Sequence, residues 1–375
     1  MEDSVAIEPG RLSVRRVAVL LAAGAAATVS LLLLAPAIAD LPDTWGRLTS
    51  GDGRWLLAAL GFEALSFVGH IVLFRAVARD AGPRVGLRAS TEITLAGHAA
   101  TRLFAAGGAG GIALTAWALR RSGMQRAAVA ARMTAFLVLL YSVYMGALIV
   151  GGTGLYVGAL PGPAPAGLTL VPAVFGAVVI ATALALPLVS GRLQRLAESR
   201  GGRLQRLAPG AAAVGDGVRA SLRFARRLDP GLAGALLWWV GDIAVLWACF
   251  EAFGHSPAVA VVVMAYFVGM LANTLPLPGG VGGVDGGMIG SLIAFGVDPG
   301  LVVVSVLAYR GFAFWLPIAP GVAAWLGLRR TVAAWEREDP AAAAAERDRR
   351  PAAPPAARRP RGDCRWPGGR ERAAA

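Results

Sequence analysis

Charged side chains occur inside apolar runs of this sequence, where their charge is costly. Arg310 lies about ten residues into the run 301–327, hence roughly 15 Å deep at 1.5 Å per residue of helix. A central arginine costs about 2.5–3.5 kcal/mol on insertion scales, and intramembrane charges usually mark a site or a pathway. Asp285 or Asp242 is the expected counter-charge. The sequence therefore predicts a charged site around Arg310, with a purely structural ion pair as the alternative.

A second pair of ionisable residues, Glu63 and His70, lies in the apolar run 55–78. The two residues are seven apart, which places them on one face of a helix. An intramembrane carboxylate is expensive and is by default a candidate functional group. The alternative is that Glu63 forms a structural hydrogen bond to a neighbouring helix.

The stretch 271–287 interrupts an apolar region with prolines and glycines, as Leu-Ala-Asn-Thr-Leu-Pro-Leu-Pro-Gly-Gly-Val-Gly-Gly-Val-Asp-Gly-Gly. Pro276 and Pro278 cannot continue a helix. A break at membrane depth is tolerated only where protein or a water-filled cavity covers the backbone, and transporters hold substrates at such breaks. The simpler interpretation is a tight turn between two short spans, with Asp285 capping the second helix.

A second glycine-rich segment, 91–119, is followed directly by Arg120 and Arg121 and preceded by other arginines. Because cytoplasmic loops are the basic ones, a re-entrant hairpin explains this segment better than a full span. Its tip would be residues 107–111, and His98 and Arg102 share a helix face just before it. The tips Gly-Gly-Ala-Gly-Gly and Gly-Gly-Val-Gly-Gly match, which suggests the inverted repeats of many transporters.

Composition supports a membrane protein, since hydrophobic residues make up 56% and charged residues only 16%. The net charge of +13 would indicate nucleic acid in a soluble protein. Here the arginines lie between apolar runs, so positive-inside topology explains them and no nucleic-acid partner is expected. Cys249 and Cys364 lack metal-site spacing, and we expect neither metal nor cofactor. The expected location is the bacterial plasma (inner) membrane, with both termini cytoplasmic.

The predicted fold is an all-α polytopic membrane protein with about six full spans and two oppositely oriented re-entrant helical hairpins. The hairpins are expected near 91–119 and 257–296. The apolar runs expected to span the membrane are 17–39, 55–78, 127–150, 168–190, 231–253 and 301–327.

Three polar segments accompany this transmembrane domain, which is expected to cover residues 17–330. Residues 1–16 form a cytoplasmic N-terminus, and 331–375 form a disordered tail without apolar periodicity. Residues 191–229 carry nine arginines and are expected to be a basic cytoplasmic loop. Part of that loop also suits a basic helix lying on anionic lipid.

Residues 271–318, from the proline–glycine stretch through Ala-Tyr-Arg-Gly-Phe-Ala-Phe-Trp-Leu-Pro-Ile, resemble the C-terminal signature of the lysylphosphatidylglycerol synthase transmembrane region family. Residues 102–121 resemble its first glycine-rich segment. The family usually has Glu where this chain has Asp285. The resemblance implies a flippase-like protein that moves lipids with charged or glycosylated headgroups between leaflets. We expect no soluble aminoacyl-transferase domain after residue 330.

The sequence and the resemblance together favour transport over catalysis, with membrane lipids bearing anionic or lipid-linked headgroups as partners. Backbone N–H groups at glycine-rich tips bind phosphate, and arginines add charge-assisted bonds. The expected substrate-binding residues are Arg310, Asp285, Gly279, Gly280, Gly282, Gly283, Asn273, Arg102, Gly107, Gly108, Gly110, Gly111, Asp242 and Glu63.

Two other functions fit the same residues. An intramembrane enzyme acting on a polyprenyl phosphate would need a nucleophile or base beside the phosphate. The candidates near the tips are His98, Asp285, Thr101 and Ser291, in no spacing typical of a catalytic site. A scaffold that supports a separate glycosyltransferase would need no such group.

Overall fold

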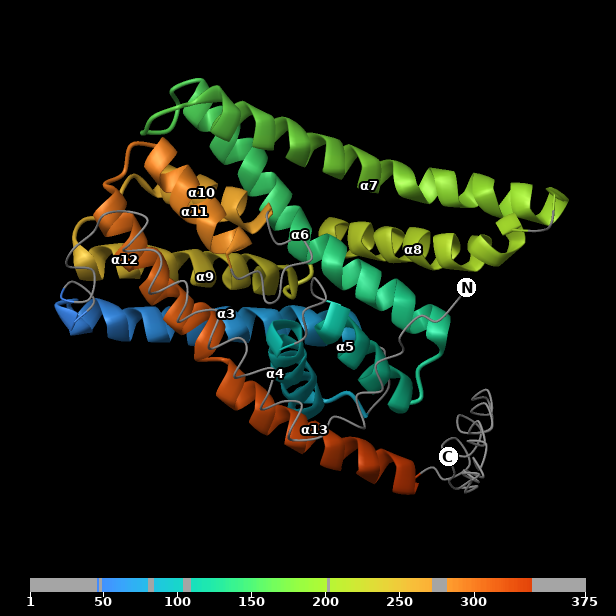
Figure 1. The fold of residues 1–375 in the computed structure, drawn as a ribbon. Helices are drawn as coiled ribbons and strands as arrows, with labels where there is room; N and C mark the ends of the chain where they lie inside the picture. Colours follow the sequence, from blue (N-terminus) through green and yellow to red (C-terminus); the bar gives the residue numbers. More distant parts are fainter. Residues whose placement is uncertain are drawn as a thin grey trace, which may run out of the picture.

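The computed structural model describes residue 46 and residues 49–79, 84–103, 109–200, 203–271 and 282–338, which form helices and no β-strand (Figure 1). The helices are α3 (Gly53–Ala78), α4 (Leu87–Leu103), α5 (Ala109–Arg121), α6 (Arg126–Tyr156), α7 (Ala166–Arg200), α8 (Arg203–Arg226), α9 (Leu232–Phe253), α10 (Val259–Leu271), α11 (Gly283–Ala294), α12 (Pro299–Arg310), the π-helix η4 (Gly311–Trp315) and α13 (Ile318–Glu338).

Five helical segments within the described residues are long and apolar enough to cross a membrane. They are Gly53–Ala78, Arg126–Tyr156, Ala166–Arg192, Leu232–Phe253 and Pro299–Glu338. Each coincides with one predicted span, so the all-helical, multi-pass fold is confirmed. The predicted first span, 17–39, and the N-terminal segment 1–16 lie outside the described residues.

Short helices form two pairs at the places where hairpins were predicted. Helices α4 and α5 pack together, as do α10 and α11. They have 17, 13, 13 and 12 residues, fewer than the roughly 20 needed to cross a bilayer. Figure 1 shows α10 and α11 near the end of the molecule where α3 begins, and α4 and α5 nearer the end where α13 finishes. Residues 107 and 108 of the first predicted tip and residues 279–281 of the second lie outside the described residues, whereas 109–111 begin α5 and 282–283 lie at the start of α11.

Glycine allows close contact within each of these pairs. A Cβ at Gly111 in α5 would lie 2.6 Å from the carbonyl oxygen of Gly97 in α4. A Cβ at Gly269 in α10 would lie 2.8 Å from the backbone nitrogen of Met288 in α11. Small residues that let helix backbones approach are the usual basis of helix packing in membranes. Glycines therefore allow close helix packing in both pairs, and in each pair a glycine-rich segment of the sequence joins the two helices.

The last helix differs from the prediction, which ended the folded domain at residue 330. Helix α13 continues to Glu338, and Val332 and Trp335 are buried in a cluster with residues of α4 and α5. Thr331 Oγ1 donates to Glu92 Oε2 of α4 at 2.7 Å. The apolar face and this hydrogen bond stabilise the extra turns, so the predicted tail begins too early. Residues 339–375 lie outside the described residues.

The segment 191–229, expected to be a basic cytoplasmic loop that includes a helix, is largely helical, because α7 runs on to Arg200 and α8 occupies most of the remainder. Helix α8 packs against α6 and α7. A Cβ at Gly217 would lie 2.6 Å from the carbonyl oxygen of Ala131 in α6. The small residues of α8 thus allow it to pack closely against α6 of the same chain, which the charge of the segment did not indicate.

Among the described helices, α3 and α9 form the most extensive contact, and Figure 1 shows them running side by side. Glycines allow this approach: a Cβ at Gly69 would lie 2.6 Å from the backbone nitrogen of Trp238 and 2.7 Å from the carbonyl oxygen of Gly234. Ser66 Oγ donates to the Trp238 carbonyl at 2.9 Å. This contact fixes α3 and α9, which both carry acidic residues of the site.

We expect Gly69→Val to destabilise the protein, because the new side chain would meet backbone atoms of α9 that cannot move aside. Overpacking of this kind costs about 1–3 kcal/mol. Thermal unfolding in detergent, followed by circular dichroism, would measure the loss. Gly61→Val is the matched control, since Gly61 lies in the same helix with no atom within 4 Å of its Cβ position. Equal melting temperatures for the two variants would contradict the packing argument.

Candidate functional site

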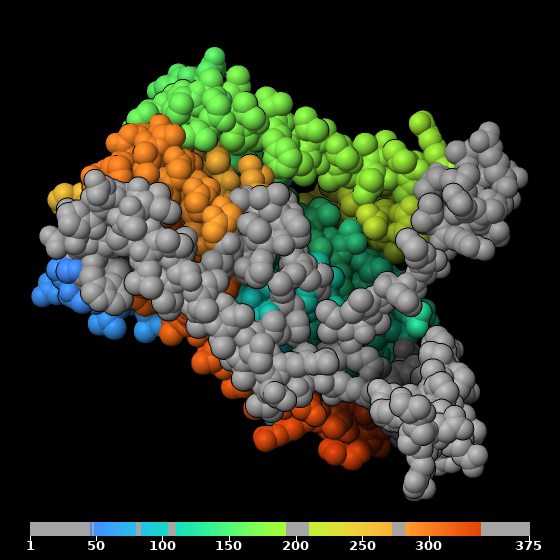
Figure 2. All heavy atoms as spheres, viewed as in Figure 1, coloured from blue at the N-terminus to red at the C-terminus, as the bar shows by residue number. Residues whose placement is uncertain are grey.

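A cavity of about 560 Å³ lies among the helices and is lined by residues from α3, α4, α5, α6, α7, α9, α10, α11, α12 and η4. Its walls are mainly apolar and aromatic, with a few charged and polar groups. Figure 2 shows residues near 100–140, in teal, set between α7–α8, in green, and α12–α13, in orange to red. Ligand sites typically combine such a concave apolar surface with a small number of placed polar groups.

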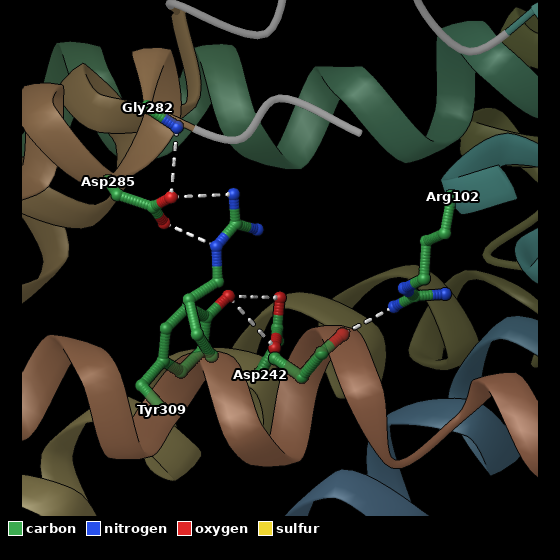
Figure 3. A network of polar contacts seen from close by, with 7 residues as sticks. Arg102, Asp242, Gly282, Asp285 and Tyr309 are labelled. Atoms are coloured by element: carbon green, nitrogen blue, oxygen red, sulfur yellow. Dashed lines mark hydrogen bonds and ion pairs between the residues drawn. The ribbon is translucent and has the colours of Figure 1, made fainter. Parts of the chain in front are cut away.

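Arg310, the last residue of α12, forms an ion pair with Asp285 in the first turn of α11. Its Nε faces Asp285 Oδ1, and its Nη2 donates to Asp285 Oδ2 at 3.1 Å (Figure 3). Only 2% of the Asp285 side chain and 13% of the Arg310 side chain are exposed. A guanidinium presents paired donors that match a carboxylate in this way. The predicted counter-charge for Arg310 is therefore confirmed as Asp285.

Asp285 also holds the beginning of α11 in place. Its Oδ2 accepts from the backbone N–H of Gly282 at 3.1 Å. Gly282 has φ of +84°, a conformation that glycine adopts without steric cost. The N-cap of α11 is therefore Gly282, and not Asp285 as the sequence had suggested. Asp285 lies three residues further on, and its carboxylate binds both the Gly282 N–H and Arg310.

Asp242 in α9, the other candidate partner of Arg310, is instead bound by two tyrosines. The hydroxyl of Tyr266 in α10 donates to Asp242 Oδ2, and the hydroxyl of Tyr309 in α12 lies 3.3 Å from both carboxylate oxygens. Figure 3 shows Tyr309 and Asp242 facing each other beside the Asp285 ion pair. Sequence reasoning missed both tyrosines. The available signal was that a buried tyrosine hydroxyl needs a partner.

Arg102 in α4 reaches across to η4, where its Nη2 donates to the carbonyl oxygen of Ala313 at 2.5 Å. That carbonyl would accept from residue 317 in a regular α-helix, but Pro317 has no N–H. Arg102 thus supplies a donor that the helix lacks. No carboxylate among the described residues lies within ion-pair distance of Arg102, although the charges of Glu63 and Asp242 act on it.

Glu63 in α3 is only 4% exposed, and its Oε2 has no hydrogen-bond partner among the described residues. The charges of Asp242 and Arg102 act on it. His70, seven residues along the same helix, is also buried, so the expected shared face is confirmed. The structure therefore gathers Glu63, Asp242 and Arg102 from three separate helices.

Two histidines lie beside this cluster. His98 Nε2 and His70 Nδ1 are 3.3 Å apart, and their rings contact Trp238. His98 and Arg102 both line the cavity, as their spacing on one helix face predicted. The histidine pair joins α3 to α4 at the wall of the cavity.

The glycine positions expected to bind substrate divide into two groups. Gly111 lines the cavity, Gly110 is buried at the start of α5, and Gly282 and Gly283 begin α11. The other positions, Gly107, Gly108, Asn273, Gly279 and Gly280, lie outside the described residues.

The hydroxyl groups considered as catalytic candidates bind backbone carbonyls. Thr101 Oγ1 donates to Gly97 at 3.0 Å, and Ser291 Oγ lies 2.7 Å from the carbonyl of Gly287, each within its own helix. A nucleophile is normally found within hydrogen-bond reach of a base. In the described residues neither hydroxyl is bound to a basic side chain, so the arrangement does not resemble a nucleophile–base pair.

Comparison with known proteins identifies the family of the chain. The model of the lysylphosphatidylglycerol synthase transmembrane region matches residues 17–321, most of the chain. The chain belongs to this family. The match covers α3 to α12, η4 and the first residues of α13, so every charged residue of the site lies within the family region. The resemblance inferred from residues 271–318 is therefore confirmed.

Shorter matches connect the chain to three proteins of the archaeon Methanothermobacter thermautotrophicus, each named "UPF0104 membrane protein". One is 32% identical over 107 residues, 28% of this chain and 32% of that protein. Another is 29% identical over 108 residues, 28% of this chain and 31% of the relative. The third is 34% identical over 89 residues, covering 23% and 26%. The chain thus matches about a third or less of the length of these relatives.

Proposed function

We propose that this protein moves a membrane lipid with an anionic, phosphate-containing headgroup between the two leaflets. The observation that carries the proposal is Arg102, a cation at the cavity wall whose described hydrogen bond goes to a neutral carbonyl. Arg310 already has Asp285 as its partner. Arginine binds phosphate through paired, charge-assisted hydrogen bonds, so Arg102 is the group that a phosphodiester would engage.

The surroundings of Arg102 suit a lipid better than a water-soluble anion. Apolar side chains such as Phe136, Leu140 and Val179 line the same cavity. These walls can contact acyl chains while the headgroup reaches Arg102. Short, interrupted helices that meet at a binding site are also a feature of transporters, and the pairs α4–α5 and α10–α11 both contribute residues to this cavity.

The proposal includes a membrane orientation. Arg120 and Arg121 end α5, Arg126 begins α6, and Arg329 and Arg330 lie in the second half of α13. Because cytoplasmic segments are the basic ones, we assign this end of the molecule to the cytoplasm of a bacterial cell. The α4–α5 pair would then be a re-entrant hairpin from the cytoplasmic side, and α10–α11 one from the opposite side.

Lipid movement can be tested with purified protein in phosphatidylcholine vesicles that contain a trace of fluorescently labelled phosphatidylglycerol. Dithionite destroys the label in the outer leaflet only. We expect it to destroy more of the label in protein-containing vesicles than in empty ones, because lipid from the inner leaflet becomes accessible. Labelled phosphatidylcholine is the control for unselective leakage. Bleaching equal to that of empty vesicles would exclude the proposed activity.

A further inference from the structure

Glu63 is a buried carboxylate that the lipid site does not need for binding phosphate. It lies near the middle of α3 with 4% of its surface exposed, and its Oε2 has no partner among the described residues. An ionised carboxylate buried without hydrogen bonds or a counter-charge is very costly and tends to become neutral. Glu63 therefore has the surroundings of a group that takes up a proton.

The groups that act electrostatically on Glu63, or lie on the same helix, come from several packed helices. Helix α9 contributes Asp242, α4 contributes Arg102, and α12 contributes Tyr309, whose hydroxyl also binds Asp242. His70 lies two turns further along α3. The two tyrosine hydroxyls donate to Asp242, which stabilises the ionised form of that residue. Two neighbouring carboxylates rarely ionise together unless a nearby cation compensates them. A proton taken up by this pair when Arg102 turns to another anion therefore belongs on Glu63.

Arg102 connects this proton to the lipid site. A single arginine faces two acidic residues, and in the structure it donates to the Ala313 carbonyl. When the Arg102 guanidinium binds a phosphate, it compensates less of the negative charge of Glu63 and Asp242. A proton on Glu63 restores the balance, so the anion and the proton favour each other's binding. This relation is reciprocal by thermodynamic linkage.

We propose that Glu63 is a proton-binding site and that the protein carries a proton together with each anionic headgroup. This inference rests on the lipid movement proposed above and adds its energy source. A proton passes from water to Glu63 as the headgroup engages Arg102, and it returns to water after the headgroup leaves. A singly charged headgroup and a proton have no net charge, so the cycle responds to a pH gradient and not to membrane voltage.

The proton itself can be detected without measuring transport. A protonated buried carboxyl group has a C=O stretching band in the infrared that shifts in heavy water. We expect this band in purified protein supplied with phosphatidylglycerol, and we expect Glu63→Gln to remove it. Glu251→Gln is the matched control, because Glu251 lies at the end of α9 and its carboxylate accepts from the backbone N–H of Ser256. A band that survives in Glu63→Gln would overturn the proton site.

Coupling is tested in the dithionite assay with a pH gradient across the vesicles and the voltage clamped at zero. Labelled phosphatidylglycerol should accumulate in the leaflet facing the alkaline side, by about tenfold per pH unit for one proton per lipid. In Glu63→Gln, the lipid that still moves should distribute evenly, whereas Glu251→Gln should match the wild type. Even distribution in the wild type would overturn coupling while leaving lipid movement intact. No movement at all would instead refute the proposed function.

Discussion

Replacing Arg102 with glutamine is expected to remove most of the selective movement of phosphatidylglycerol. Charge-assisted hydrogen bonds contribute about 1.5–3 kcal/mol each, which corresponds to roughly 10- to 100-fold in affinity. Glutamine keeps a neutral amide donor on a shorter side chain and offers no charge to a phosphate. The initial rate of label loss at limiting lipid concentration, measured in the vesicle assay, would give the size of the effect.

Two further variants separate the binding role of Arg102 from effects of net charge. Arg75→Gln removes the same charge from an exposed position on α3 and should leave the rate unchanged. Arg102→Lys keeps the charge but loses the planar pair of donors, so an intermediate rate is expected. If Arg75→Gln and Arg102→Gln reduced the rate equally, general electrostatic attraction would explain the effect and the headgroup site would be wrong.

The membrane spans could be predicted from the sequence because their signal is local. A run of about 20 apolar residues has few alternatives to a helix in a bilayer. Arg310 and Asp285 were predictable as partners for a similar reason, since a buried arginine requires a nearby negative charge. The sequence offered two acidic candidates and could not choose between them. The choice depends on α11 and α12 meeting, which is a property of the tertiary fold.

The sequence contains an apolar helical pattern at the end of α13, but the charged residues around it led to the prediction of a disordered tail. Leu328, Val332 and Trp335 follow one another at spacings of four and three, which is the period of a helix face. Arg329 and Arg330 among these positions, and the charged residues 336–338 directly after them, made the segment look like a solvated tail. Burial of the apolar face against α4 and α5 decided the outcome.

The cluster of Glu63, Asp242 and Arg102 could be recognised only in part. Each residue was conspicuous as a charge in an apolar or glycine-rich segment. Their convergence depends on α3 packing on α9 through Gly69 and Gly234 and on α4 lying against both α3 and α13. The contact between Arg102 and Ala313 depends further on a missing N–H at Pro317, which matters only once α4 and η4 are adjacent.

Asp285→Ala is expected to cause the largest loss of stability among single substitutions at the site. It leaves the Arg310 guanidinium, 13% exposed, without its counter-charge and removes the acceptor for the Gly282 N–H. Removing one partner of a buried ion pair costs about 3–5 kcal/mol, whereas replacing both partners by apolar groups is often neutral. The double variant Asp285→Ala, Arg310→Met should therefore recover much of the loss.

Unfolding of the two single variants and the double variant gives a double-mutant cycle, whose coupling energy isolates the ion pair. Asp285→Glu is the conservative control, because it keeps the charge while lengthening the side chain. Additive losses, with no recovery in the double variant, would show that the two residues act separately. Transport by the double variant then decides the purpose of the pair. If the recovered protein moves phosphatidylglycerol at the wild-type rate, the pair holds α11 against α12. If it is stable but inactive, Arg310 exchanges Asp285 for the headgroup during the cycle. The cavity then contains two arginines, Arg102 and Arg310, that bind the phosphate at successive steps.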